Sequence, residues 1–290
     1  MSANPASLRI AVAQLELIDG DRDANLAKIA ATVAAHGDGH DILVLPETCT
    51  SGFASLDDVD RLAEPLDGPT VRTLQSLARA HDLLIVAGIP ERAPEGLYNT
   101  AVLVDGNGPR TSYRKTHLWL ADRDKFLPGE RFVTTQWRGM TVAPLICFDI
   151  EFPETARAVC ALGARLIVVC NGNMEPYAHA HRVAAMARAQ DNQCFVAMAN
   201  RTGRGRVDVF AGGSLVTAPD GRVLAEAGRE ETVLSVSIDP AEIETSRHVY
   251  DYLALRRIGL VAELLASQPP LEQRKDTLSP AISPPETPHP

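Results

Sequence analysis

The sequence lacks several features that define whole classes of protein. It contains no uninterrupted apolar run of about 18 residues, so no transmembrane helix is expected. Its first residues, MSANPASLRIAVAQ, lack the charged region and the apolar region of a signal peptide. No Gly-x-Gly-x-x-Gly follows a strand-like run, which disfavours a dehydrogenase with a dinucleotide fold. A tandem repeat at a solenoid period is also absent.

Cysteine is scarce, and basic residues are outnumbered by acidic ones. The five cysteines are odd in number and form no Cys-x-x-Cys, so we expect no disulfides and a reducing cytoplasm. The net charge of −9 disfavours nucleic acid as the main partner. With 45% apolar and 22% charged residues, the composition is that of a soluble globular protein. A core of this size needs no metal or disulfide.

Short apolar runs alternate with helical periodicity along most of the chain. The expected strands are residues 8–17, 41–46, 83–89, 99–104, 140–149, 165–170 and 194–199, and the expected helices are 25–35, 71–80, 153–162 and 178–190. Strands 140–149 and 165–170 should be parallel neighbours because a helix connects them. The later runs 213–217, 223–227 and 232–238 predict an antiparallel extension. This β-α-β rhythm predicts an α/β fold with helices covering buried sheets.

The chain is expected to form one domain over residues 1–266. The segment 267–290, SQPPLEQRKDTLSPAISPPETPHP, has many prolines and few large apolar residues. Such a composition predicts a tail without fixed structure.

Three segments carry candidate chemistry. Cys147 follows an apolar run and enters a polar turn ahead of a helix, where backbone N–H groups stabilise both a thiolate and an oxyanion. Glu47 follows a predicted strand in LPETCTSGF, and Lys115 lies in YRKTHL. Each residue alone is more often a surface charge or a core thiol. Together they suggest a cysteine nucleophile with a carboxylate and a cation as partners.

These segments resemble the nitrilase, or carbon–nitrogen hydrolase, superfamily, whose members carry Glu, Lys and Cys in this order. The resemblance runs from about Arg9 to about Leu265. Supporting motifs are PY at 176–177, ARAQDNQ at 187–193, AN at 199–200, FAGGS at 210–214 and PDG at 219–221. The strings YRKTHL, CFDIEFPE and NMEPY are similar to the amidase branch, in particular to bacterial ω-amino-amide amidases of the 5-aminopentanamidase type and to stereoselective amidases.

The resemblance implies a four-layer α-β-β-α sandwich that assembles as a homodimer or higher homo-oligomer. It implies hydrolysis of a small aliphatic carboxamide to a carboxylic acid and ammonia through a cysteine thioester. Mapped by motif, Cys147 is the implied nucleophile, Glu47 the general base and Lys115 the oxyanion stabiliser, helped by the backbone N–H of Phe148. The implied partners are an amide substrate and water, with no cofactor, no metal and no membrane.

Many relatives carry a second glutamate after the lysine, and here aspartates occupy that region. Asp122 is the closest match by spacing, and Asp124 is the runner-up. Whether such an aspartate positions the lysine or lies in a surface turn stays open. Glu154 either organises the cysteine turn or caps the next helix.

Substrate contacts are expected after strand ends, where the sites of α/β proteins gather. Phe53, Asn173, Glu175 and Tyr177 occupy such positions. We hypothesise that Glu175 binds an ammonium group of the substrate.

Two other functions share this sequence evidence. An N-carbamoyl-amine hydrolase would use the same three residues and also release carbon dioxide. A catalytically silent relative would bind small amides or a partner protein, although it would have no reason to keep all three groups. A metal site is disfavoured, because His179 and His181 are two residues apart and point to different sides of a helix.

Overall fold

Strand β1 (Leu8–Glu16) is central to an eight-stranded sheet. In the computed structural model, which describes residues 7–259, β1 pairs in parallel with β2 (Ile42–Val44) on one side. On the other side it pairs first with β14 (Thr232–Ile238) and then with β10 (Arg201–Arg204). The sheet is completed by β3 (Leu84–Ala93), β4 (Gly96–Asp105) and β5 (Gly108–Arg114) beyond β2, and by β11 (Val209–Ala211) beyond β10.

A second sheet has six strands. Its order is β13 (Val223–Glu226), β12 (Leu215–Thr217), β9 (Phe195–Ala199), β8 (Leu166–Cys170), β7 (Met140–Ile146) and β6 (Thr135–Trp137). The central strands β7, β8 and β9 are parallel, with Ile146 opposite Cys170 and Cys170 opposite Ala199. Their carboxyl ends therefore meet at one edge of the sheet.

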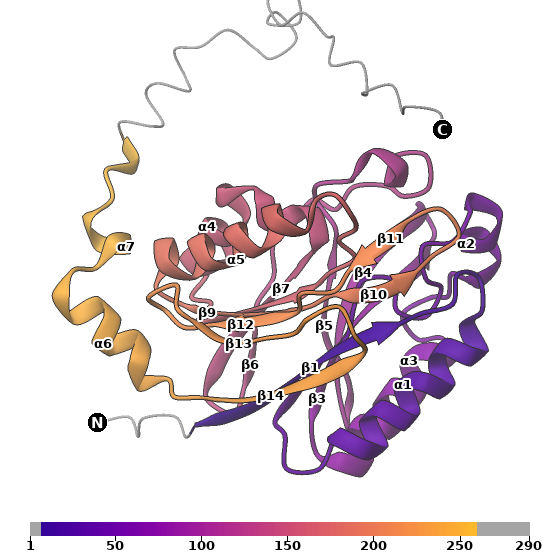
Figure 1. The fold of residues 1–290 in the computed structure, drawn as a ribbon, viewed down its shortest axis with the longest axis horizontal. Coiled ribbons are helices and arrows are strands. Elements are labelled where there is room, and N and C mark those ends of the chain that lie inside the picture. Colours follow the sequence, from indigo (N-terminus) through magenta and orange to yellow (C-terminus); the bar gives the residue numbers. More distant parts are fainter. Residues whose placement is uncertain (1–6, 260–290) are drawn as a thin grey trace, which may run out of the picture. The chain divides into compact units, whose positions relative to one another are not determined.

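The two sheets pack face to face and helices cover both outer faces (Figure 1). Along β1, Ile10 and Val12 point into the core between the sheets, whereas Ala11 and Ala13 point toward the helices. Helices α1 (Arg22–His36) and α3 (Pro69–His81) cover the eight-stranded sheet, and α4 (Pro153–Ala161) and α5 (Ala178–Asn192) cover the other. The expected four-layer α-β-β-α sandwich is confirmed.

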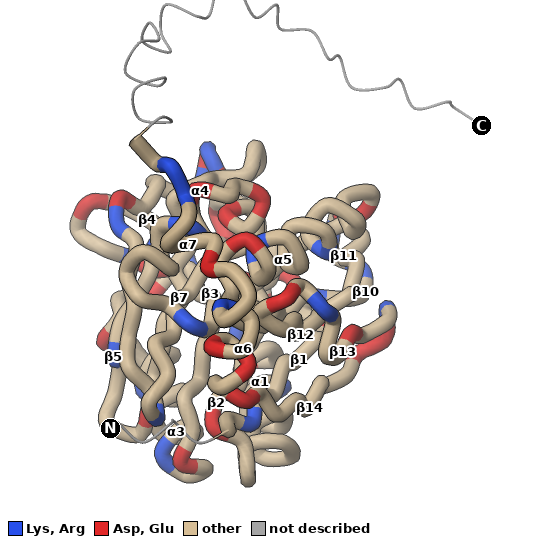
Figure 2. The backbone as a smooth tube through the Cα atoms, turned by 90° about the vertical axis from the view of Figure 1, so that its left-hand side faces the viewer, with Lys and Arg blue, Asp and Glu red and all other residues tan. Residues whose placement is uncertain are grey.

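The remaining elements are short. They are α2 (Leu56–Leu62), the 3₁₀ turns η1 (Leu120–Asp122) and η2 (Cys147–Glu151), α6 (Ala241–Val249) and α7 (Tyr252–Leu255). Figure 2 shows basic and acidic residues interspersed along the backbone. Within residues 7–259 no helix has the length and apolarity needed to cross a membrane. The expected domain end at residue 266 and the tail 267–290 lie outside the described residues.

Two expectations about the strands need correction. The strand expected over 140–149 ends at Ile146, because the Asp149 carboxylate accepts the N–H of Ile146 and closes a 3₁₀ turn. The last three strands do not form one extension. β12 and β13 extend the six-stranded sheet, whereas β14 joins the other sheet. The space for β14 exists because β10 pairs only with Leu15 and Glu16, which leaves residues 8–14 of β1 open.

Candidate active site

The candidate residues emerge from both sheets at one edge. Glu47 follows β2 and Lys115 follows β5 in the eight-stranded sheet, whereas Cys147 directly follows β7 in the six-stranded sheet. The sheets are joined at this point, because the backbone N–H of Glu47 donates to the carbonyl of Asn171, which follows β8 (3.1 Å). The site is therefore built across the packing of the two sheets.

The carboxyl group of Glu47 is fully buried and firmly held. Its Oε1 accepts hydrogen bonds from Asn99 Nδ2 and from Lys115 Nζ, each at 2.7 Å. Its Oε2 has no hydrogen-bond partner among the described residues. The backbone of Gly88 packs tightly against Glu47, since a Cβ added at Gly88 would lie only 2.7 Å from Glu47 Cα. One oxygen is thus committed to positioning, and the other remains available for chemistry.

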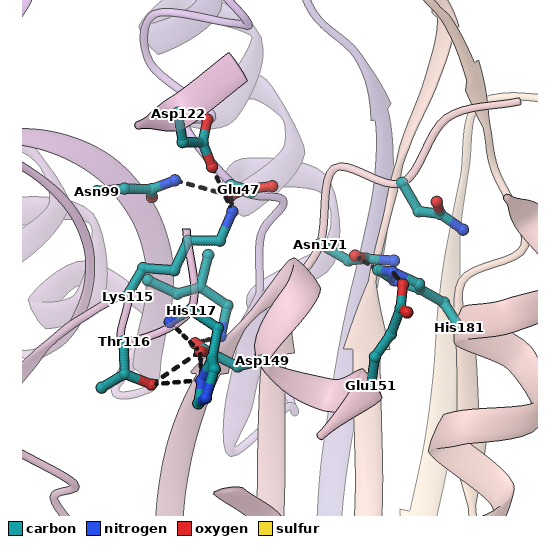
Figure 3. A network of polar contacts seen from close by, with 12 residues as sticks. Glu47, Asn99, Lys115, Thr116, His117, Asp122, Asp149, Glu151, Asn171 and His181 are labelled. Carbon is teal, nitrogen blue, oxygen red and sulfur yellow. Dashed lines mark hydrogen bonds and ion pairs between the residues drawn. The ribbon is translucent and has the colours of Figure 1, made fainter. Parts of the chain in front are cut away.

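Lys115 is a buried cation between two carboxylates (Figure 3). Its Nζ donates to Glu47 and, at 2.6 Å, to Oδ2 of Asp122. Burial lowers the pKa of Lys115, but the charges of Glu47 and Asp122 outweigh it and raise the pKa well above 10.5. The side chain is therefore an ammonium. Asp122 reaches it because the 3₁₀ turn η1 turns that carboxylate inward, whereas Asp124 is exposed.

Cys147 occupies a strained position at the start of η2. Its φ is +43°, a conformation that residues other than glycine rarely adopt. Burial raises the pKa of the thiol well above 9.0, and the charge of Glu47 adds to this effect. Lys115 and a backbone hydrogen bond from Gly172 lower the pKa without reversing the shift. Burial therefore outweighs the backbone N–H groups that the sequence analysis expected to favour a thiolate.

The Asp149 carboxylate ties the lysine segment to the cysteine turn. It is fully buried and accepts from the hydroxyls of Tyr113 (2.8 Å) and Thr116 (2.9 Å) and from the backbone N–H of His117 (2.9 Å). The same carboxylate accepts from the N–H of Ile146 (3.2 Å). The contacts with Thr116 and His117 can be followed in Figure 3. Asp149 therefore fixes the segment that carries Lys115 relative to the turn that carries Cys147.

A narrow cavity of about 20 Å³ opens onto the cysteine. Its walls are formed by Phe53, Lys115, Trp119, Cys147, Phe148, Glu151, Asn173, Met174, Tyr177 and His181. Of the predicted substrate contacts, Phe53, Phe148, Asn173 and Tyr177 are thus brought to the cavity. The ring of Trp119 meets Phe148 edge-on at 5.1 Å and Tyr177 at 5.3 Å, so the wall is largely aromatic.

Two predicted carboxylates lie elsewhere. Glu154 is exposed in the first turn of α4, and Glu175 forms an ion pair with Arg229; neither lines the cavity. Glu151 and His181, which do line it, were missed by the sequence analysis. Spacing gave no signal for Glu151, because Cys147–Glu151 forms a 3₁₀ turn, in which residues three apart rather than four share a side.

Gly172 is where the packing of the site is tightest, and we expect Gly172→Ala to disable it. An added Cβ would lie 2.6 Å from Glu47 Oε2 and 2.4 Å from Phe53 Cε2. Displacing the carboxyl should lower kcat/KM by about two orders of magnitude, and overpacking should destabilise the fold by about 1–3 kcal/mol. Amide turnover and urea unfolding measure the two effects. Gly228→Ala is the control, since a Cβ there meets no atom within 4 Å. Full activity of Gly172→Ala would contradict this geometry.

Comparison with known proteins places these observations in a family. The model of the carbon–nitrogen hydrolase family matches residues 9–248. The chain is 46% identical to an (R)-stereoselective amidase of Pseudomonas sp. over 88% of this chain and 94% of that protein. It is 36% identical to a 2-oxoglutaramate amidase of Bacillus subtilis over 83% of this chain and 96% of that protein.

A solved structure is similar as well. A mutant amidase from Nesterenkonia sp. AN1 has the acetamide moiety of fluoroacetamide covalently added at its active-site cysteine. It superposes with a TM-score of 0.77 at 29% identity, over 91% of this chain and 98% of that one.

Proposed function

This chain belongs to the carbon–nitrogen hydrolase family, and we propose that it hydrolyses a small aliphatic carboxamide to the carboxylic acid and ammonia at Cys147. One observation carries the proposal. A strained thiol on the wall of a cavity faces a buried carboxyl, one oxygen of which has no hydrogen-bond partner within residues 7–259, next to a buried ammonium. These are the groups that cysteine-dependent cleavage of an amide requires.

Acylation begins from a neutral thiol. As Cys147 Sγ attacks the amide carbon, Glu47 Oε2 takes the thiol proton, so the thiolate exists only while the new bond forms. The carbon–nitrogen bond then breaks, and Glu47 returns the proton to the leaving nitrogen. Ammonia departs and a thioester on Cys147 remains. The raised pKa of Glu47, caused mainly by burial, suits this exchange because it makes the carboxylate a stronger base.

Deacylation repeats the exchange with water. Glu47 removes a proton from a water molecule, which attacks the thioester carbon, and the carbon–sulfur bond breaks. The proton then returns to sulfur as the acid leaves, which restores the thiol. One carboxyl group thus serves as base and acid in both halves.

The oxyanion that forms at each attack needs donors that are already in place. Lys115 Nζ supplies a charge held by Glu47 and Asp122. The backbone N–H of Phe148 is a second donor, because the first N–H groups of a helical turn have no acceptor within it. Loss of one such donor raises a barrier of this kind by about 2.7–4 kcal/mol.

Mass spectrometry of a trapped intermediate tests the proposal. A panel of small amides should yield ammonia without carbon dioxide, together with an acyl mass on the peptide that contains Cys147. Carbon dioxide released along with ammonia would instead identify an N-carbamoyl-amine hydrolase. Absence of turnover and of any adduct across the panel would favour a silent binding protein.

We also propose a cytoplasmic homo-oligomer. All five cysteines are free, and the thiol of Cys160 donates a hydrogen bond to the sulfur of Cys194 (3.7 Å), which fits a reducing compartment. The exposed Val183 on α5 and Leu162 at the end of α4 offer apolar surface for a second copy.

A further inference from the structure

Glu151 places a carboxylate on the wall of the cavity, where the basic side chains among the described lining residues are Lys115 and His181. Its side chain is 32% exposed, and its Oε1 accepts a hydrogen bond from His181 Nε2 (3.0 Å). Lys115 also lines the cavity, but its ammonium already forms ion pairs with the carboxylates of Glu47 and Asp122. We propose that Glu151 binds a protonated amine of the substrate, so that the enzyme selects cationic amides. This inference rests on the proposed amide hydrolysis.

The charge around the cavity points in the same direction. Among the described lining residues, Glu151 contributes the carboxyl group, Lys115 the one lysine or arginine side chain, and His181 an imidazole that pairs with Glu151. Glu47 and Asp122 lie outside the lining and contact the ammonium of Lys115. The single ammonium of Lys115 contacts two carboxylates, so acidic groups are in excess beside the cavity. A substrate with a carboxylate tail would meet like charge, whereas an ammonium would be attracted.

The aromatic wall suits the rest of such a substrate. Trp119 joins Phe148 and Tyr177 through edge-on contacts and forms an apolar surface that starts beside the nucleophile. Methylene groups pack well on such rings, and the faces of the rings also attract ammonium groups. An amide at one end, a short hydrocarbon linker and an amine at the other end would match the cysteine, the rings and Glu151 in turn.

Glu151 is held before any substrate arrives. Arg188 donates to the backbone carbonyl of Glu151 (2.8 Å) and to that of Ile150 (3.2 Å), which anchors η2 on α5. His181 is buried, and its Nδ1 lies 2.9 Å from the amide oxygen of Asn171. Figure 3 shows Glu151, His181 and Asn171 as one cluster, apart from that of Glu47, Lys115 and Asp122. A carboxylate fixed in this way loses little entropy on binding a cation.

The ammonium role that the sequence suggested for Glu175 is therefore reassigned. The carboxylate of Glu175 pairs with Arg229, and this residue does not line the cavity. Glu151 shares the cavity with Cys147, which is the requirement for contacting both ends of one small molecule.

The test compares 5-aminopentanamide with 5-hydroxypentanamide, which has a neutral hydroxyl in place of the ammonium. Wild-type protein should prefer the amine. In Glu151→Gln, which keeps an oxygen for His181 Nε2, the ratio of the two kcat/KM values should fall by about 10- to 100-fold. Turnover of the hydroxy compound should fall by a smaller factor than turnover of the amine, because only the amine loses a charge pair. Glu244→Gln on α6 is the matched control, since that exposed carboxylate pairs with Arg165 and should leave the ratio unchanged.

A second variant guards against a folding defect. Glu151→Asp keeps the charge but withdraws it by one methylene, so the preference for amines should persist with the optimum shifted to a longer ω-amino amide. An unchanged ratio in Glu151→Gln, or equal losses on both substrates, would overturn the assignment of Glu151. Wild-type protein that releases ammonia from no amide would overturn the proposed function itself, which is a distinct result.

Discussion

Replacing Cys147 by alanine is expected to lower kcat/KM by about 10⁵- to 10⁶-fold, and Glu47→Gln should come close to the same loss. The two groups act as a unit, since the thiol attacks only when the carboxyl accepts its proton. Burial raises the pKa of the thiol well above 9.0, so the sulfur has almost no nucleophilic form of its own at neutral pH. Glutamine keeps an oxygen that can accept from Asn99 and Lys115, but it cannot accept the proton.

The decisive measurement is the double variant. If the unit acts as one, the protein with both substitutions should be no less active than either single variant. If the double variant instead shows the product of the two single losses in kcat/KM, Glu47 does not act as the base for the thiol.

The pH profile gives an independent check. The acidic limb of wild-type kcat/KM should lie above 4.5, because burial raises the pKa of Glu47 and the base must be ionised. Urea unfolding should show that all variants remain folded.

Lys115→Met is expected to remove activity and also to destabilise the fold by about 3–5 kcal/mol. The side chain is 1% exposed and lies between the buried carboxyls of Glu47 and Asp122. Without the ammonium, these two groups are left buried with like charge and no cation. Their pKa values must then rise or the structure must open, and either response costs stability. The free energy of unfolding from urea titration and the rate of ammonia release measure the two losses.

A neutral version of the cluster separates the two roles of the lysine. Lys115→Met combined with Glu47→Gln and Asp122→Asn removes every charge together. It should regain most of the lost stability, because replacing all members of a buried ionic cluster costs far less than removing one. It should stay inactive. A single Lys115→Met variant as stable as wild type would show that the carboxyls are not ionised in the resting protein.

The sequence supported the architecture well, because the period of apolar residues is a local property. Strands such as 8–17 and helices such as 25–35 correspond to β1 and α1 within a few residues. It could not assign β14 to a sheet. That choice depends on how far β10 extends along β1, which is a property of the assembled sheet.

The candidate site was only partly predictable for a related reason. Glu47, Lys115 and Cys147 follow strand ends and carry family motifs, so their order and spacing were informative. The resting protonation of the sulfur was not, because it depends on burial by segments distant in sequence. The same holds for Glu151, since a carboxylate after a turn resembles a solvated charge until α5 brings His181 against it.

The reacting atoms are carried by separate sheets, and this has a consequence for how the enzyme tolerates change. The base and the cation follow strands of one sheet, and the nucleophile follows a strand of the other. Their separation is therefore set by the thickness of the hydrocarbon layer between the two sheets, which includes Ile10 and Val86. Smaller or larger side chains in that layer would change the distance between the thiol and the carboxyl group, although they contact neither. The core packing of this molecule therefore also sets the geometry of proton transfer.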